Sequence, residues 1–273
     1  MKRLLLALLF LSLFLWTAAV GWAAAPEVRV TYVGNAGFLV AVGDYRVLID
    51  AMFDGFPGGY TLPANVGQAL SSVQPPFDGV DLILVTHNHA DHFSADMVRR
   101  HMEANPGAVL VAGRQVTEQL AVFGSRVVTL TAITGKTATT TQNGIRVEAI
   151  YLCHGIFPPG QREEVNYGYV VTIGDVSFFH TGDIDPAAIG MATFRAYSLA
   201  SKRIDFAFVP YFLLGGRSAD PEFIAAIGAA YVVAAHYEYT MAPLIRSAIL
   251  SAYPTAVVFA NDHELDSWTP PSQ

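Results

Sequence analysis

The chain has 273 residues, of which 52% are hydrophobic and 14% are charged, and its formal net charge is -7 at pH 7. This length allows one large or two small domains with a substantial buried core, which excludes a disordered chain. No run or patch of lysine and arginine appears in this acidic sequence, so we exclude binding to nucleic acid through its phosphates.

The first 25 residues have the composition of a secretory signal peptide. Lys2 and Arg3 precede the apolar run 4–16, and three alanines follow at 23–25. This order of basic, apolar and small residues is typical of a segment that is removed on export. We therefore predict a signal peptide over 1–25 and a mature protein that is periplasmic or secreted.

Two features leave the processing of this segment open. Pro26 disfavours cleavage directly after Ala25, so cleavage after Ala23 or Ala24 is an equal alternative. The run 4–25 is also long enough to cross a bilayer as an uncleaved anchor, at about 1.5 Å per helical residue. In that case the protein would contact the membrane through its N-terminal segment.

From residue 28 onward, short apolar strands alternate with turns and then with helices. The first half predicts strands at 28–33, 37–42, 45–49, 81–85, 108–111 and 127–130, a loop over 50–65, and helices ending near 72 and at 94–103 and 115–122. The second half predicts strands at 137–141, 145–151, 167–173, 176–180, 206–209, 231–235 and 256–259, and helices at 186–196, 221–227 and 242–252.

The two halves repeat the same order of elements. Each begins as an antiparallel meander, with hairpin signals such as Asn143-Gly144, and continues as alternating strand and helix. Two mixed sheets packed face to face, with helices outside, would bury these apolar strands efficiently. No linker or short repeat separates the halves, so we predict one domain over 26–273.

The strongest chemical signal follows the apolar strand at 81–85. There the chain reads Thr86-His87-Asn88-His89-Ala90-Asp91-His92. Three histidines and an aspartate within six positions cannot all be core residues, because each buried polar group needs a partner. A metal ion would supply these partners together, since imidazole nitrogen and carboxylate oxygen both bind zinc. An isolated histidine such as His101, by contrast, is expected to be a surface or hydrogen-bonded residue.

This segment resembles the His-x-His-x-Asp-His metal-binding motif of the metallo-β-lactamase superfamily. The likeness begins at 31–38, Thr-Tyr-Val-Gly-Asn-Ala-Gly-Phe, and extends through nearly the whole exported body. It implies the α/β fold of that family, a four-layer αββα sandwich. Within the superfamily the sequence is most similar to ascorbate-phosphate lactonase-like and phospholipase D-like hydrolases.

The resemblance implies three further metal ligands, each directly after a predicted strand. These are His154, Asp183 and His236. By the family pattern, one ion is held by His87, His89 and His154, a second by Asp91, His92 and His236, and Asp183 bridges the two. We expect two divalent metal ions, with zinc first and manganese or iron as alternatives for the same ligands.

This ligand set predicts hydrolysis of a small-molecule substrate outside the cytoplasm. Two bound ions can lower the pKa of a shared water from near 16 toward about 7, so that hydroxide is available at neutral pH. We expect it to attack a small ester, lactone or phosphodiester, with Asp91 both binding an ion and orienting the hydroxide. The substrate itself and the oligomeric state are left open, because pocket loops rather than the fold decide specificity.

Several other residues are candidates for supporting roles. Asp50 could hold a ligand imidazole in the required tautomer, or could simply be a turn residue. His263 could donate a proton to the leaving group, or could be an exposed C-terminal histidine. His180 is expected to have a packed, structural role. Aromatic residues in the loops, if they converge, would favour an apolar or acyl-bearing substrate; these are Phe53, Phe56, Tyr60, Phe157, Tyr211, Phe212, Tyr237 and Tyr239.

Two alternative functions remain compatible with these residues. Some relatives of the family use a di-iron version of the site in oxidoreductases, which would require a separate electron donor for this chain. A non-catalytic exported metal-binding protein is the other alternative, although degenerate relatives usually lose ligands and here every expected position is filled.

Overall fold

The computed structural model describes residues 26–55, 60–154, 165–260 and 265–271. Within these ranges, no helix has the length and apolar character needed to span a membrane. The predicted signal peptide at 1–25 lies outside the described residues.

The first sheet combines an antiparallel meander with parallel strands. The meander consists of β1 (Val28–Gly34), β2 (Gly37–Val42) and β3 (Tyr45–Ile49), and the parallel part adds β4 (Leu82–Val85), β5 (Val109–Ala112) and β6 (Val127–Thr129). A last short strand, β13 (Asp266–Trp268), pairs antiparallel with β1, so that the order is β13-β1-β2-β3-β4-β5-β6.

The second sheet has the same construction. Its meander consists of β7 (Thr137–Gln142), β8 (Ile145–Cys153), β9 (Val165–Ile173) and β10 (Val176–His180), and β11 (Phe206–Pro210) and β12 (Tyr231–Ala235) continue it in parallel. The strand order is β12-β11-β10-β9-β8-β7. The repeated order of elements seen in the sequence therefore corresponds to two similar sheets.

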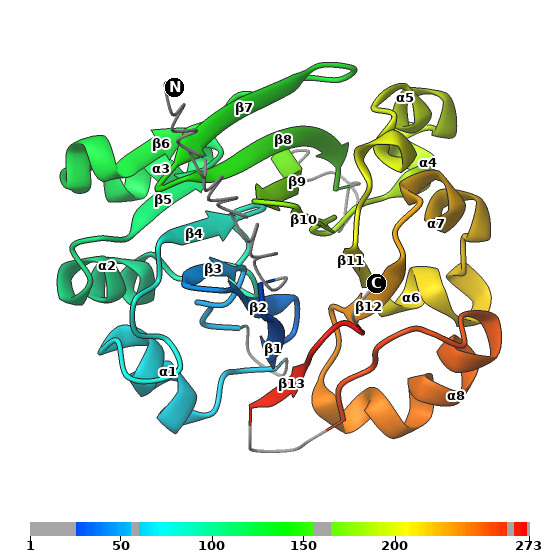
Figure 1. Ribbon diagram of the computed structural model, residues 1–273, viewed down its shortest axis with the longest axis horizontal. Coiled ribbons are helices and arrows are strands. Elements are labelled where there is room, and N and C mark those ends of the chain that lie inside the picture. The colour runs from blue at the N-terminus through cyan, green and yellow to red at the C-terminus, as the bar shows by residue number, and fades with distance from the viewer. Residues whose placement is uncertain (1–25, 56–59, 155–164, 261–264, 272–273) are drawn as a thin grey trace, which may run out of the picture.

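The sheets form the two inner layers of the molecule, and helices form the outer layers (Figure 1). The first sheet is covered by α1 (Ala64–Ser71), α2 (Ala95–Ala104) and α3 (Arg114–Thr117), and the second by α4 (Pro186–Ile189), α5 (Met191–Ala196), α6 (Tyr211–Leu214), α7 (Pro221–Ile227) and α8 (Ala242–Ala252). Alternate residues of β4 enter different cores: Leu82 and Leu84 pack between the sheets, whereas Ile83 and Val85 pack beneath α1 and α2. The predicted αββα sandwich is confirmed.

Three predicted elements differ from the structure. The strand expected at 256–259 makes one isolated bridge, Val257 with Val233, and the chain then crosses to the first sheet, where β13 was not predicted. The helix expected at 115–122 is a short α3 followed by an irregular 3-10 segment, Glu118–Arg126, in which the backbone is non-helical at Leu120 (φ −124°) and again at Gly124 (φ +57°). The helix expected at 186–196 is divided at Gly190, whose φ is +75°.

Candidate metal centre

The chemistry-bearing residues lie where strands of both sheets end. The motif at 86–92 follows β4, and His154, Asp183 and His236 follow β8, β10 and β12, which run in the same direction. The two sheets are joined at this edge, because the Tyr169 hydroxyl donates a hydrogen bond to the carbonyl of Val85 (2.9 Å). The fold therefore brings four loops together at one edge of the sandwich.

The first group of side chains consists of three histidines: His87, His89 and His154. Their ring centroids are 4.6 to 4.8 Å apart, and His87 Nε2 lies 3.1 Å from His89 Nδ1. Two ligands that bind one tetrahedral ion at 2.0–2.1 Å are separated by about 3.4 Å. The three imidazoles are thus spaced as ligands of a single ion would be.

The second group consists of Asp91, His92, Asp183 and His236. His236 Nε2 lies 3.4 Å from Asp91 Oδ2 and 2.9 Å from Asp183 Oδ2. His92 Nε2 lies 3.7 Å from Asp91 Oδ2 and 3.2 Å from Asp183 Oδ1. These separations also match the spacing of ligands around one ion.

Asp183 connects the two groups. Its Oδ2 atom is 3.5 Å from His154 Nε2 of the first group and 2.9 Å from His236 Nε2 of the second. Four buried atoms at this centre make no well-aligned hydrogen bond, although other proposed ligand atoms lie within 4 Å of them: Nε2 of His92, His154 and His236, and Oδ1 of Asp183. Buried polar atoms are normally paired by hydrogen bonds, so these atoms fit a site for metal ions. All seven predicted ligands converge here.

Asp50 lies behind the histidines, after β3, and is almost fully buried. Its Oδ2 accepts hydrogen bonds from His92 Nδ1 (2.8 Å) and from the Thr86 hydroxyl (2.6 Å), and Oδ1 accepts from the Thr86 amide. Because the Thr86 hydroxyl donates to Asp50, its oxygen is left to accept from His87 Nδ1, at 3.0 Å. Both imidazoles therefore present Nε2 to the centre. Of the two roles considered for Asp50, these contacts agree with the orientation of a ligand imidazole.

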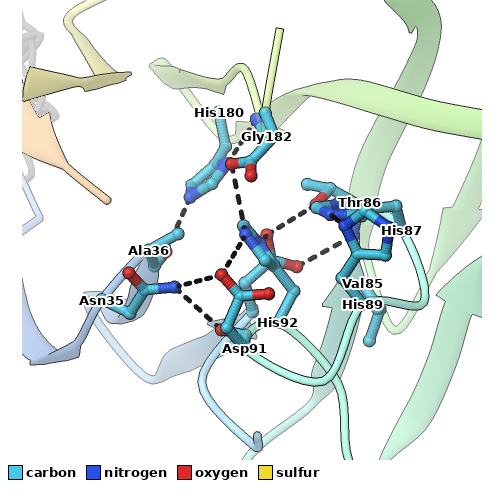
Figure 2. Close-up of polar contacts among 12 residues, drawn as sticks. Asn35, Ala36, Val85, Thr86, His87, His89, Asp91, His92, His180 and Gly182 are labelled. Atoms are coloured by element: carbon cyan, nitrogen blue, oxygen red, sulfur yellow. Dashed lines mark hydrogen bonds and ion pairs between the residues drawn. The ribbon is translucent and has the colours of Figure 1, made fainter. Parts of the chain in front are cut away.

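Asn35 is a site residue that the sequence analysis did not single out. It appeared there only within the segment 31–38 that carries the family resemblance. It lies in the turn between β1 and β2 with φ +49°, and its side-chain amide donates to the Asp91 carbonyl (2.9 Å) and to Asp91 Oδ2 (3.3 Å) (Figure 2). Its own carbonyl accepts from the amide of His236 (2.8 Å), another residue with a left-handed backbone. Asn35 thus connects ligands from both halves of the chain.

His180 and Asn166 hold the loop that carries Asp183. His180 is buried, donates from Nε2 to the Ala36 carbonyl (2.8 Å) and accepts from the Gly182 amide at Nδ1 (3.0 Å) (Figure 2). Asn166 accepts from the Asp183 amide (3.2 Å) and donates to the Thr181 carbonyl (3.0 Å). A side chain at Gly182 would collide with Asn166, so glycine is required there. The structural role predicted for His180 agrees with these contacts.

The acids and imidazoles of the centre shift one another's pKa values. Burial favours the neutral form of His236, but Asp183 and Asp91 outweigh it and raise the pKa of His236 to about 9. Burial also opposes charge on His92, but Asp183 and Asp50 raise the pKa of His92 well above its ordinary value. Burial opposes the ionised form of Asp183 as well, yet the surrounding histidines hold the pKa of Asp183 well below its usual range. His87 differs, because burial lowers its pKa.

The remaining candidates lie elsewhere or beyond the described ranges. His101 is buried on α2, away from the centre, with Nδ1 2.7 Å from the Leu70 carbonyl. His263, Phe56 and Phe157 lie outside the described residues. Of the loop aromatics, Phe212 approaches the centre with its ring centroid 6.2 Å from that of His236.

Comparisons with known proteins place these residues in a family. A family model described as beta-lactamase superfamily domain matches residues 45–237, more than half of the chain. A UPF0173 metal-dependent hydrolase of Thermococcus kodakarensis is 27% identical over 197 residues, which cover 70% of this chain and 77% of that relative.

Two solved structures share the fold. A metallo hydrolase of the archaeon Ignicoccus hospitalis is 18% identical with a TM-score of 0.60, covering 89% of this chain and 98% of that one. A diiron beta-hydroxylase of Streptomyces venezuelae is 15% identical with a TM-score of 0.58, covering 90% of this chain and 54% of that one. The likeness to these two structures concerns the fold alone, whereas the predicted narrower branch within the family stays a prediction. The match over 45–237 and the similarity to UPF0173 proteins identify the chain as a metal-dependent hydrolase that belongs to the beta-lactamase superfamily.

Proposed function

We propose that this protein is exported, holds two divalent metal ions, and hydrolyses a small ester, lactone or phosphodiester. The observation that carries the proposal is the convergence of seven side chains from four loops into two groups, with buried ligand atoms that make no well-aligned hydrogen bond. The proposed partner is a small-molecule substrate and no nucleic acid is involved, since no basic patch accompanies the acidic charge balance.

The residues present fit two ions of charge +2. Asp91 and Asp183 supply two negative charges, and the five imidazoles can bind as neutral ligands. When bound, such ions lower the pKa of water from near 16 toward about 7 and polarise the bond to be cleaved. Histidine and carboxylate ligands favour zinc, whereas manganese or iron would accept the same set.

The chain's own groups would organise this chemistry. Asp50 and Thr86 fix the tautomers of His92 and His87, so that Nε2 of each ring faces the centre. Asp91 is mostly buried, and Asn35 holds its carboxylate in place. We assign Asp91 the role of orienting the attacking water and accepting its proton. The proposed proton donor to the leaving group, His263, lies outside the described residues.

Export is proposed from the N-terminal sequence. Lys2 and Arg3, the apolar run 4–16 and the alanines at 23–25 together have the order of a signal peptide. Mass spectrometry of the protein recovered from outside the cytoplasm would test this. A mature N-terminus after Ala23, Ala24 or Ala25 supports cleavage, an intact membrane-bound chain supports an anchor, and an intact cytoplasmic chain contradicts export.

Elemental analysis of the purified protein tests the metal centre, followed by an activity panel of esters, lactones and phosphodiesters with zinc, manganese or iron. About two ions per chain and turnover of one substrate class are expected. Replacing His89 or Asp183 with alanine should abolish that turnover. An anaerobic redox titration separates the di-iron alternative, because a zinc protein is redox-silent. Metal-loaded protein that is inert toward the whole panel contradicts the proposal.

A further inference from the structure

Beside the second ligand group lies a small surface formed by Tyr60, Glu238 and Tyr239, which we call the aromatic-acid corner. Tyr239 and Glu238 follow the ligand His236 by three and two residues, so Glu238 Cα lies within about 7 Å of His236 Cα. Tyr60 packs over Gly34, where an added Cβ would lie 2.6 Å from Tyr60 Cε1. Gly34 precedes Asn35, which holds Asp91. The corner therefore lies next to the second ligand group, adjoining His236 along the chain and Asn35 through Gly34.

The rings of the corner are arranged as two walls. The ring centroids of Tyr60 and Tyr239 are 5.9 Å apart and their planes meet at 81°. Phe53 lies behind Tyr60 with its centroid 6.0 Å away, and it is almost fully buried. Tyr60, Glu238 and Tyr239 are themselves partly exposed. Two perpendicular aromatic faces beside a reaction centre are a suitable surface for a group that interacts with electron-rich rings.

The third member of the corner is an acid without a cationic partner. Glu238 Oε2 accepts a hydrogen bond from the Thr240 hydroxyl (3.1 Å), and within the described part of the chain no lysine, arginine or histidine forms an ion pair with this carboxylate. Burial first, and then the charges of Tyr239 and Glu238, raise the pKa of Tyr60 to about 12, so its ring stays a neutral phenol at physiological pH.

These features discriminate between classes of substrate. A phosphate or carboxylate group in the corner would be repelled by Glu238. An uncharged aryl or alkyl group would pack on the rings but would remove water from the Glu238 carboxylate without compensation. An ammonium group would interact favourably with both the tyrosine rings and Glu238, because it is attracted to the ring faces and to the carboxylate.

We propose that the aromatic-acid corner binds an ammonium group of the substrate, next to the bond that the metal centre cleaves. This inference rests on the proposed function and specifies its substrate class as a cationic ester, lactone or phosphodiester. Binding of the ammonium group can be measured without turnover, so the corner and the hydrolytic activity can be tested separately.

The test compares choline with its uncharged isostere, in which a carbon atom replaces the quaternary nitrogen, by calorimetric titration of the zinc-loaded full-length protein. Choline should bind about tenfold more tightly. The E238Q variant should lose most of this preference, and Tyr60→Leu should weaken choline binding whereas Tyr60→Phe keeps it, because the ring face carries the interaction. Glu222→Gln, an exposed acid paired with Arg195 on another surface, is the matched control and should change nothing.

Equal binding of choline and its isostere would overturn the proposal, and so would an unchanged preference in E238Q. If the preference is found but no ester, lactone or phosphodiester is hydrolysed, the corner stands and the proposed function fails. If neutral substrates are hydrolysed as fast as their cationic analogues and E238Q changes neither rate, the proposed hydrolase function is supported and ammonium binding at the corner is contradicted.

Discussion

The two ligand groups differ in charge and in how firmly the fold holds them. The first group is three imidazoles, and its clearest support is Thr86 behind His87. The second contains two carboxylates, and each of its four members is hydrogen-bonded from outside: His92 by Asp50, Asp91 by Asn35, and Asp183 and His236 through their backbone amides, by Asn166 and Asn35.

The difference has a consequence for metal binding. A cation gains more from two carboxylates than from imidazoles alone, and ligands already held in position lose less conformational entropy on binding. We therefore expect the ion of the second group to bind more tightly and the ion of the first group to dissociate first when a chelator is added. Asp183 contacts both groups, so we expect its carboxylate to contribute to the binding of both ions.

Asp183→Ala should have the largest effect, because it removes a carboxylate from both groups at once. We expect hydrolysis to fall by at least about 1,000-fold, since the electrostatic stabilisation lost is worth several kcal/mol. Metal content should fall for both ions, as measured by elemental analysis after dialysis. The control is Asp185→Ala, two residues away, which removes the N-cap of α4 but no proposed ligand. Two ions retained by the Asp183 variant would refute its shared position.

Asp50→Asn should affect the second group more than the first. The amide cannot accept from His92 Nδ1 and the Thr86 hydroxyl as the carboxylate does. Loss of such a supporting carboxylate costs about 10- to 100-fold in metal affinity. Chelator competition should show this loss for the tighter ion. Asp205→Asn removes a similar carboxylate that accepts from the Ser177 amide at the opposite end of the second sheet, and should leave both affinities unchanged.

The metal-free protein should become less stable as the pH rises from 6.5 toward 9. The pKa of His236 is raised to about 9 in the folded state, so its stabilising interaction is complete below its unfolded pKa of about 6.5 and is lost as the pH rises through about 9. We expect a loss of about 1–2 kcal/mol between pH 6 and 9.5, reduced from the full shift because a quarter of this side chain is exposed.

The carboxylates of the second ligand group give the stability of the metal-free protein the opposite pH dependence. The pKa values of Asp91 and Asp183 are lowered, so their contribution is present above about pH 3.9 and is lost as the pH falls below it. Burial lowers the pKa values of His87, His101 and His180, so the metal-free fold also loses stability as the pH falls below about 6.5. Urea unfolding in a chelator should therefore show highest stability near about pH 6.5. Zinc should reverse the trend above pH 6.5, because its binding releases protons from the histidines. Metal-free protein that is most stable at pH 9 would contradict this assignment.

The family resemblance implied the positions of His154, Asp183 and His236, and each of them also follows a strand that is recognisable locally. The partners of the ligands could not be predicted, since Asn35 and Asn166 are polar residues in a turn and a strand whose contacts depend on segments 56 and 17 positions away. The incorrect prediction of a strand at 256–259 has the same origin, because it also depends on a distant contact. Apolar residues at 256–259 resemble a strand, but Phe259 packs on Tyr32 of the first sheet instead of extending a ladder with β12.

Asn35→Ala should have the smallest effect and gives the sharpest comparison between the groups. It removes the side-chain hydrogen bonds to the Asp91 carbonyl and to Asp91 Oδ2 but keeps the backbone carbonyl that accepts from His236. A hydrogen bond of this kind is worth about 0.5–1.5 kcal/mol, so the ion of the second group should bind about two- to tenfold more weakly, with no change in the first. Asn143→Ala is a matched control, because Asn143 also has φ +49° in a tight turn and donates to two backbone carbonyls, yet lies in the β7–β8 hairpin. Equal metal affinities in both variants would show that Asn35 only shapes the turn, whereas weakening confined to Asn35→Ala would show that the β1–β2 turn tunes one ion of the pair.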